Sequence, residues 1–96
     1  MSVEMIQAIR HDPGDNVAVV VVEGVEADQA LSTWIMEGDG RRTIVARQRI
    51  PVGHKIAVNN ILAGSKVVNY GATICVANID ILVGDHVYIH NIDREQ

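Results

Sequence analysis

Aromatic residues are nearly absent from this 96-residue chain, which has no Phe, one Trp and two Tyr. The hydrophobic core must therefore be built from Val, Ile, Leu and Ala, although apolar residues still make up 48% of the sequence. β-Branched side chains fit a pleated sheet better than a helix, so the composition predicts a mainly β protein. A chain of this length is expected to form one domain with a modest core, which disfavours a complete enzyme with its own substrate pocket.

Cysteine and basic residues are also scarce. Cys75 is the single cysteine, which excludes an intrachain disulfide and fits a reducing, cytoplasmic environment. The net charge of −4 disfavours nucleic acid as a partner, because phosphate neutralisation requires clustered Lys and Arg. The only basic concentration comprises Arg41, Arg42, Arg47 and Arg49, and we interpret it as a solvated strand face.

Long apolar runs are missing, so we expect no membrane-spanning segment and no membrane partner. The start of the chain, MSVEMIQAIRHD, lacks a basic leader followed by a continuous apolar stretch, and we expect no signal peptide. We predict one domain over residues 1–96, with a lead-in at 1–14, a core at 15–92 and a tail at 93–96.

Turn residues divide the chain into short strands. The run NVAVVVVEG at residues 16–24 is almost all Val and predicts a strand buried on both faces, after a turn at HDPGD. A bend or bulge is expected at Gly71. Further strands are expected at residues 54–58, 66–70, 73–77 and 86–92. These elements predict a compact all-β fold with little helix.

A short repeat supplies three of the turns. Residues 50–56 (IPVGHKI), 61–67 (ILAGSKV) and 81–87 (ILVGDHV) share the form Ile-x-x-Gly-x-x followed by Val or Ile. Glycine readily takes the positive φ that a tight turn requires. We therefore expect three similar turns, each leading into a strand, within one domain rather than in a solenoid.

The segment at residues 25–47 allows two interpretations. The stretch EADQALSTWI places apolar residues at helical spacing. Alternatively, residues 33–37 pair with residues 42–47 in a hairpin around Gly38-Asp39-Gly40. We favour the hairpin, with any helical turn confined to the residues before Ser32, because two glycines flanking an aspartate stop a helix.

Two histidines and a tyrosine alternate in DHVYIHN, near the end of the chain. On an extended strand, His86, Tyr88 and His90 share one face, while Val87, Ile89 and Ile92 are expected to pack inward. Neighbours on one face are about 7 Å apart, so the two histidines would be separated by about twice that distance. A metal ion needs ligand nitrogens within about 2 Å of itself, so both could not bind one ion on a straight strand, and a third group would be required.

His54, which follows the first of the three turns, is the candidate for that third group. A strand carrying His54 beside one carrying His90 would bring both side chains to one edge. The residues leave two alternatives open: a metal or catalytic role for these histidines, or histidines that are only exposed or hydrogen-bonded on a strand surface.

Other types of site are disfavoured. The sequence has no Ser-His-Asp arrangement with a nucleophile elbow, and GDG at residues 38–40 is a hairpin turn rather than a phosphate loop. Cys75 lies among apolar residues in TICVA, which favours a buried and inert thiol. Asp80 and Asp85 flank a turn and are explained as turn formers rather than as an acid and base pair.

Four motifs in order resemble a known family. They are DNVAV (15–19), GHKIAV (53–58), ILAGSKVVNYG (61–71) and GDHVYIHN (84–91). They resemble the N-terminal domain of altronate and galactarate dehydratases, and the likeness is weakest at residues 25–42. The resemblance implies a SAF domain, which is a compact β-clip fold of short strands.

In that family the SAF domain precedes a much larger catalytic domain, and the enzymes remove water from sugar acids with help from a divalent metal, typically Fe²⁺. The resemblance implies that this chain is a separately encoded small subunit, as in the related sulfolactate sulfo-lyases, which eliminate sulfite from a hydroxy acid. The implied partners are a large catalytic subunit and a small hydroxy-acid substrate. Both reactions take a proton from carbon next to a carboxylate, which requires a positioned acid or base and a metal that neutralises the enolate.

The matching motifs also imply roles for individual residues. His54 and His90 would be catalytic, and His90 would also be a metal ligand. Lys55, Tyr88 and Asn91 would bind the substrate, with Lys55 contacting its carboxylate.

Two departures from the family pattern fall near this expected working face. Tyr88 stands where the family has the first histidine of His-x-His-Asn, and tyrosine is a poor ligand for a divalent metal although its hydroxyl can donate a hydrogen bond. Residues 73–75 are Thr-Ile-Cys instead of Pro-Ile-Gly, which puts a side chain where the backbone normally approaches closely. The choice of substrate is therefore not transferred from the family.

Three functions are consistent with the sequence. We favour the small subunit of a sugar-acid or hydroxy-acid lyase. The alternatives are a freestanding SAF module that binds a carbohydrate or acidic ligand without catalysis, and an assembly module that forms a homo-oligomer through exposed edge strands. A stoichiometric large partner would favour the first, ligand binding by the isolated chain the second, and self-association without ligand the third.

Overall fold

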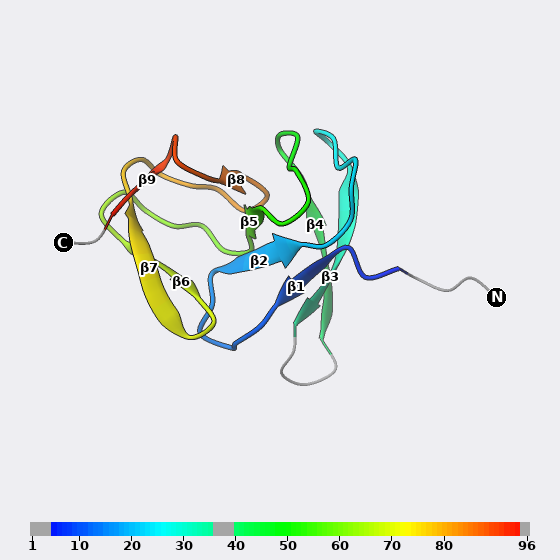
Figure 1. Cartoon of the computed structure of the whole chain (residues 1–96), viewed down its shortest axis with the longest axis horizontal. Coiled ribbons are helices and arrows are strands. Elements are labelled where there is room, and N and C mark those ends of the chain that lie inside the picture. The colour runs from blue at the N-terminus through cyan, green and yellow to red at the C-terminus, as the bar shows by residue number, and fades with distance from the viewer. Residues whose placement is uncertain (1–4, 36–39, 95–96) are drawn as a thin grey trace.

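Two β-sheets make up the described part of the chain, which is residues 5–35 and 40–94 of a computed structural model. The strands in these residues are β1 (Ala8–Arg10), β2 (Val17–Val20), β3 (Ala30–Ile35), β4 (Arg41–Val45), β5 (Lys55–Ala57), β6 (Lys66–Asn69), β7 (Ala72–Ala77), β8 (His86–Val87) and β9 (Ile92–Asp93). The larger sheet has the order β4-β3-β1-β2-β5-β8, and the smaller has the order β6-β7-β9 (Figure 1). The predicted mainly β fold is confirmed. Over the same residues, no helix is long and apolar enough to cross a membrane.

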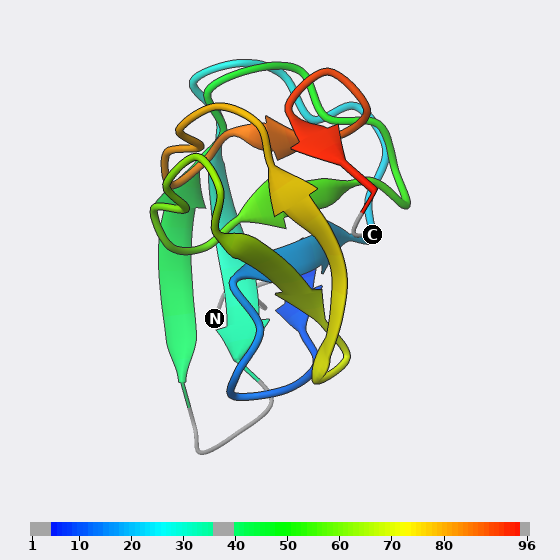
Figure 2. The same ribbon diagram turned by 90° about the vertical axis from the view of Figure 1, so that its left-hand side faces the viewer.

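The aliphatic core is divided into two clusters that share β2. Ala18 and Val20 belong to the cluster at the larger sheet, whereas Val17 belongs to the cluster beneath the smaller sheet. The smaller sheet lies in front of β2 in Figure 2, and β6 contacts β2. β2 is therefore buried on both faces, as the Val run predicted. It is shorter than expected, because the strand ends at Val20 and Val21 is 43% exposed.

The core begins at β1, before residue 15, where the sequence predicted its start. We expected residues 1–14 to be a lead-in, but β1 lies between β2 and β3, antiparallel to the first and parallel to the second. Ala8 in this strand is fully buried. Three residues are too few to show an alternating pattern, so β1 is recognisable only by its partners.

The hairpin predicted within residues 25–47 is present. β3 and β4 pair antiparallel from Ala30 opposite Val45 to Trp34 opposite Arg41, so the helical alternative is wrong. The expected turn residues Gly38 and Asp39 lie outside the described residues. The basic residues of β4 are exposed, which confirms a solvated strand face.

The three-copy repeat forms three equivalent turns. In each copy the glycine has a positive φ, between 84° and 93°, and the next N–H donates to the carbonyl three residues earlier, as in a type II turn. These hydrogen bonds are His54 to Pro51 (3.1 Å), Ser65 to Leu62 (2.9 Å) and Asp85 to Leu82 (2.9 Å). The turns lead into β5, β6 and β8, as predicted.

A fourth turn of the same form was not predicted. At residues 25–29, the N–H of Gln29 donates to the carbonyl of Glu26 (3.2 Å), and Asp28 occupies the glycine position with a φ of 70°. Aspartate is one of the few residues other than glycine that adopt this left-handed conformation. Because the repeat was defined by its glycine, the copy with Asp28 was not recognised in the sequence. The four copies form two pairs through the isolated bridges Val25–Ile50 and Ile61–Ile81.

A buried aspartate joins the β1–β2 loop to the β6–β7 hairpin. Asp15 is 1% exposed, and its carboxylate accepts the N–H groups of Gly71 (2.8 Å), Tyr70 (2.9 Å) and Asp12 (3.2 Å). Tyr70 and Gly71 have φ values of 54° and 74°, which both lie on the positive side as a type I′ hairpin turn requires. The bend expected at Gly71 is thus confirmed, and Asp15 holds it in place.

Replacing Asp15 with Ala is expected to lower the free energy of unfolding by about 3 kcal/mol, because three backbone N–H groups lose a charged acceptor. Urea denaturation would measure this loss. Asp80→Ala is the matched control. Among the described residues, the exposed Asp80 carboxylate accepts one N–H, that of Ala63 (2.8 Å), and should contribute less than about 1 kcal/mol. If both variants lost the same free energy of unfolding, Asp15 would not have the stabilising role between the loop and the hairpin that we assign to it. The Asp80 carboxylate thus bonds the neighbouring turn at residues 61–65 rather than its own, so its predicted role as a former of the turn at residues 81–85 stays a prediction.

Candidate functional site

The segment at residues 86–92, in which His86, Tyr88 and His90 alternate with aliphatic residues, does not form a single strand. β8 contains only His86 and Val87, and a turn at residues 88–91 separates it from β9. The predicted strand is therefore wrong. Val87 is buried as expected, but Ile89 is 76% exposed instead of packed inward.

Asn91 shapes this turn. The residue is 3% exposed, its Oδ1 accepts the N–H of Tyr88 (3.0 Å), and its Nδ2 donates to the carbonyl of His86 (2.8 Å). The N–H of Asn91 also donates to the carbonyl of Tyr88 (3.1 Å). Both ends of the side chain are thus used within the chain. Substrate binding by Asn91 stays a prediction, whereas its contribution to the turn is direct.

The turn brings four rings together, and we call His54, His86, Tyr88 and His90 the ring cluster. The ring centroids of His86 and His90 are 5.5 Å apart. Tyr88 stacks on His54 at 4.6 Å and on His86 at 5.3 Å. The predicted separation of the two histidines by about 14 Å, which assumed an extended strand, is therefore wrong.

His54 reaches the cluster because two copies of the repeat feed adjacent strands. β5 and β8 lie side by side (Figure 1) and pair antiparallel, with Ile56 opposite His86. Because side chains alternate along a strand, His54, two residues before Ile56, is on the same face as Ile56 and His86. Nδ1 of His54 lies 2.9 Å from Nε2 of His86. We predicted His54 next to the strand that carries His90, and the structure places His86 directly against it.

The backbone of His86 is held by a residue that the sequence did not indicate. Oε1 of Gln48 accepts the N–H of His86 (2.7 Å), and Nε2 of Gln48 donates to Asp85 (2.8 Å). Nε of Arg47 donates to the same Asp85 oxygen (2.9 Å). The other Asp85 oxygen accepts the N–H of Leu82 (2.7 Å), which confirms Asp85 as a turn former. No sequence signal points to Gln48, because it lies 38 residues before its partner.

The environment of His86 favours its neutral form. Partial burial lowers the pKa of His86 below 6.5, and the nearby charges of His54 and His90 lower it further. A hydrogen bond between two imidazoles also requires one unprotonated nitrogen as acceptor. One ring of the His54–His86 pair therefore donates the shared hydrogen bond and the other accepts it, and paired imidazoles are side chains suited to acid-base chemistry.

Lys55 is not part of the ring cluster. It lies opposite Val87 on the neighbouring strand, and because side chains alternate along β5, it points to the face opposite His54. Burial raises the pKa of the Cys75 thiol, and the positive charge of Lys55 partly offsets this effect. Cys75 is only 4% exposed, so the expected buried thiol is confirmed. The role of Lys55 with a substrate carboxylate stays a prediction.

By itself, the ring cluster could supply only some of the ligands that a metal ion needs. Within residues 5–35 and 40–94, no group of three His, Cys, Asp or Glu side chains is arranged to hold a metal ion. Imidazole is a suitable ligand for iron, so the donor type fits. However, the facing nitrogens of His54 and His86 are 2.9 Å apart and bonded to each other. An ion here would need further ligands from outside the described residues.

Comparison with known proteins shows what the chain is similar to. The profile of the altronate/galactarate dehydratase SAF domain matches residues 6–95. The alpha subunit of (2R)-sulfolactate sulfo-lyase from Chromohalobacter salexigens is 39% identical over 91 residues, which are 95% of this chain and 97% of that subunit. The corresponding subunit from Paracoccus pantotrophus is 40% identical over 48 residues, which are 50% of this chain and 72% of that one.

Altronate dehydratase from Escherichia coli is 37% identical over 86 residues. The match covers 90% of this chain but only 16% of that enzyme. The same domain thus occurs as nearly all of one relative and as a small part of another.

Proposed function

Because the chain belongs to the family of altronate/galactarate dehydratase SAF domains, we propose that it is the small subunit of a lyase acting on a sugar acid or a related hydroxy acid. The observation that carries this proposal is the 39% identity to a sulfo-lyase alpha subunit along nearly the whole of both chains. An alpha subunit implies a second type of subunit. The proposed partner is a large catalytic subunit, and the proposed substrate is a small hydroxy acid.

The ring cluster is the proposed contribution of this chain to the active site. Elimination next to a carboxylate requires that a proton is taken from one carbon and that the group leaving the neighbouring carbon is stabilised. His90 is exposed on its turn, where a partner subunit can close over it. The ring of His86 is next to it, and His86 in turn is hydrogen-bonded to His54. His90 is the proposed acid or base at the reacting atoms, and the His54–His86 pair supplies or accepts the proton.

A divalent metal ion, Fe²⁺ by family resemblance, would supply positive charge that stabilises a developing enolate when it is bound. Instead of acting as the acid or base, His90 would in that case be the ligand from this chain, and residues of the large subunit would complete the coordination. Tyr88 replaces the histidine that the family usually has, and its phenol is a hydrogen-bond donor rather than a metal ligand.

The residues proposed for substrate binding differ in their positions. Tyr88 is 43% exposed, and its ring lies within the cluster. Asn91 is occupied in the turn and Lys55 points to the other face. Tyr88 is therefore the proposed substrate contact, and Asn91 is proposed to position it.

Reconstitution with the large subunit of the same family, encoded in the same genome, tests this function. The two purified chains should form a complex of fixed stoichiometry in size-exclusion chromatography with light scattering. The complex should release sulfite or water from one member of a panel of sulfolactate, altronate, galactarate and related acids, and neither chain should do so alone.

Two results would contradict the proposal. One is a large subunit that turns over its substrate equally well without the small chain. The other is the absence of any complex, together with tight binding of a hydroxy acid by the isolated small chain, which would favour a freestanding binding module.

A further inference from the structure

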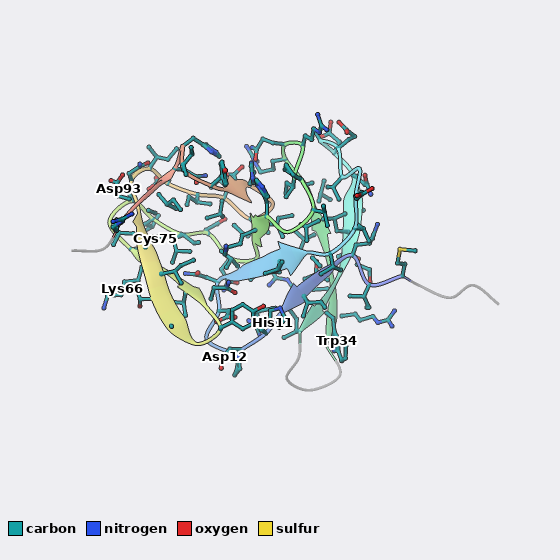
Figure 3. The ribbon with its side chains drawn as sticks, viewed as in Figure 1. His11, Asp12, Trp34, Lys66, Cys75 and Asp93 are labelled. Atoms are coloured by element: carbon teal, nitrogen blue, oxygen red, sulfur yellow. The ribbon has the colours of Figure 1, made fainter. Side chains whose placement is uncertain are left out.

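An apolar groove opens beside the ring cluster, between β7 and the turn at residues 88–91. Its volume is about 250 Å³, and its lining residues are Ile74, Cys75, Ile89, Ile92, Asp93 and Arg94. Ile89 is 76% exposed and Ile74 is 41% exposed. Figure 3 shows Cys75 and Asp93 at the same end of the molecule, with Trp34 at the other end.

The groove exists because β9 covers only part of β7. β9 pairs with Val76 and Ala77, and the rest of β7 has no strand partner on that side among the described residues. The pairing of β7 with β6 is also irregular, since Val67 faces Cys75 but Val68 faces Thr73. Ile74 is therefore the extra residue of a β-bulge, at the wall of the groove.

The positions of the two isoleucines indicate a contact surface. One exposed isoleucine is ordinary on a protein surface, but here two large apolar side chains line one hollow beside a candidate site. Ile89 lies between Tyr88 and His90 on the same turn. A chain that covers these two rings would therefore also come close to Ile89. The bulge at Ile74 disfavours addition of a strand to β7, so the contact would be made by side chains.

We propose that this groove is the docking site for an apolar segment of the large subunit, an inference that rests on the proposed function. Two observations select this occupant. Ile89, which lines the groove, lies in the chain between Tyr88 and His90 of the ring cluster. In addition, the same domain makes up only 16% of altronate dehydratase, so in that relative it works beside a much larger remainder of the protein. Asp93 and Arg94 supply a charged rim around an apolar centre, which is typical of protein interfaces.

Binding of the purified large subunit to variants of this chain tests the proposal. Ile89→Asp and Ile74→Asp each place a charge in the groove and are expected to raise the Kd at least tenfold. Trp34→Asp is the matched control, because Trp34 is also 41% exposed and lies at the far end of the molecule (Figure 3). Its Kd should stay within twofold of the wild-type value in the same calorimetric titration.

The outcomes separate this inference from the proposed function. If the wild-type chain binds the large subunit and both isoleucine variants bind equally well, the docking site is wrong and the lyase function stands. If the wild-type chain does not bind, both fail. Thermal melts verify folding, and Ile89→Asp decides the matter alone if Ile74→Asp does not fold, because the side chain of Ile89 is mostly in solvent.

Discussion

Replacing His90 with Ala in the two-subunit enzyme is expected to lower kcat by about 10²- to 10⁴-fold, which is the usual contribution of a positioned acid or base. The exposed ring of His90 lies 5.5 Å from that of His86, at the outer edge of the cluster. Under the proposed function, removing it would separate the reacting atoms from the His54–His86 pair. Initial rates at saturating substrate measure the effect.

His11→Ala is the control for this variant. His11 stacks on Tyr70 at 4.3 Å and lies outside the ring cluster, so its replacement should leave kcat within about twofold. The metal content of the complex distinguishes two roles for His90. A ligand would lose metal together with rate, whereas an acid or base would lose rate alone. An unchanged kcat for His90→Ala would exclude both roles.

Gly84→Ala is expected to destabilise the fold by more than about 4 kcal/mol, which is exceptional for one methyl group. Gly84 has a φ of 93°, and a Cβ atom there would overlap the carbonyl oxygen of Val45. The surrounding backbone cannot easily move away. The carbonyl of Gly84 accepts the N–H of Arg47 (2.9 Å), and its N–H donates to Ala57 (2.9 Å). Urea denaturation of the isolated chain measures the loss.

Gly64→Ala separates overlap from backbone strain. Gly64 occupies the same position in its turn with a φ of 87°, but a Cβ atom added there would meet no atom of the described residues within 4 Å. Its replacement should cost only the left-handed backbone penalty, about 1–2 kcal/mol. If both glycine variants lost the same free energy of unfolding, the backbone of Val45 would have moved to accommodate the new methyl group at residue 84. Since Gly84 precedes His86 by two residues, the overlap would also disturb the ring cluster.

The failed strand at residues 86–92 shows where local patterns mislead. The alternation of rings and aliphatic residues is typical of a strand. The segment contains neither glycine nor proline, so nothing in it marks a turn strongly. The turn instead depends on the Asn91 side chain, which bonds the backbone of Tyr88 and His86. Asparagine is a known turn former, and it was the available signal.

The sequence by itself determined most of the strands, three of the four repeated turns and the family resemblance, because these features depend on residue type and short spacing. Glycine at a positive φ and runs of Val act locally, whatever lies across the sheet. Only the tertiary structure decided that His54, His86 and His90 meet, that Gln48 holds His86, and that a groove opens beside Ile89. These contacts join residues distant along the chain, and their positions follow from strand register and from a turn closed by one buried side chain.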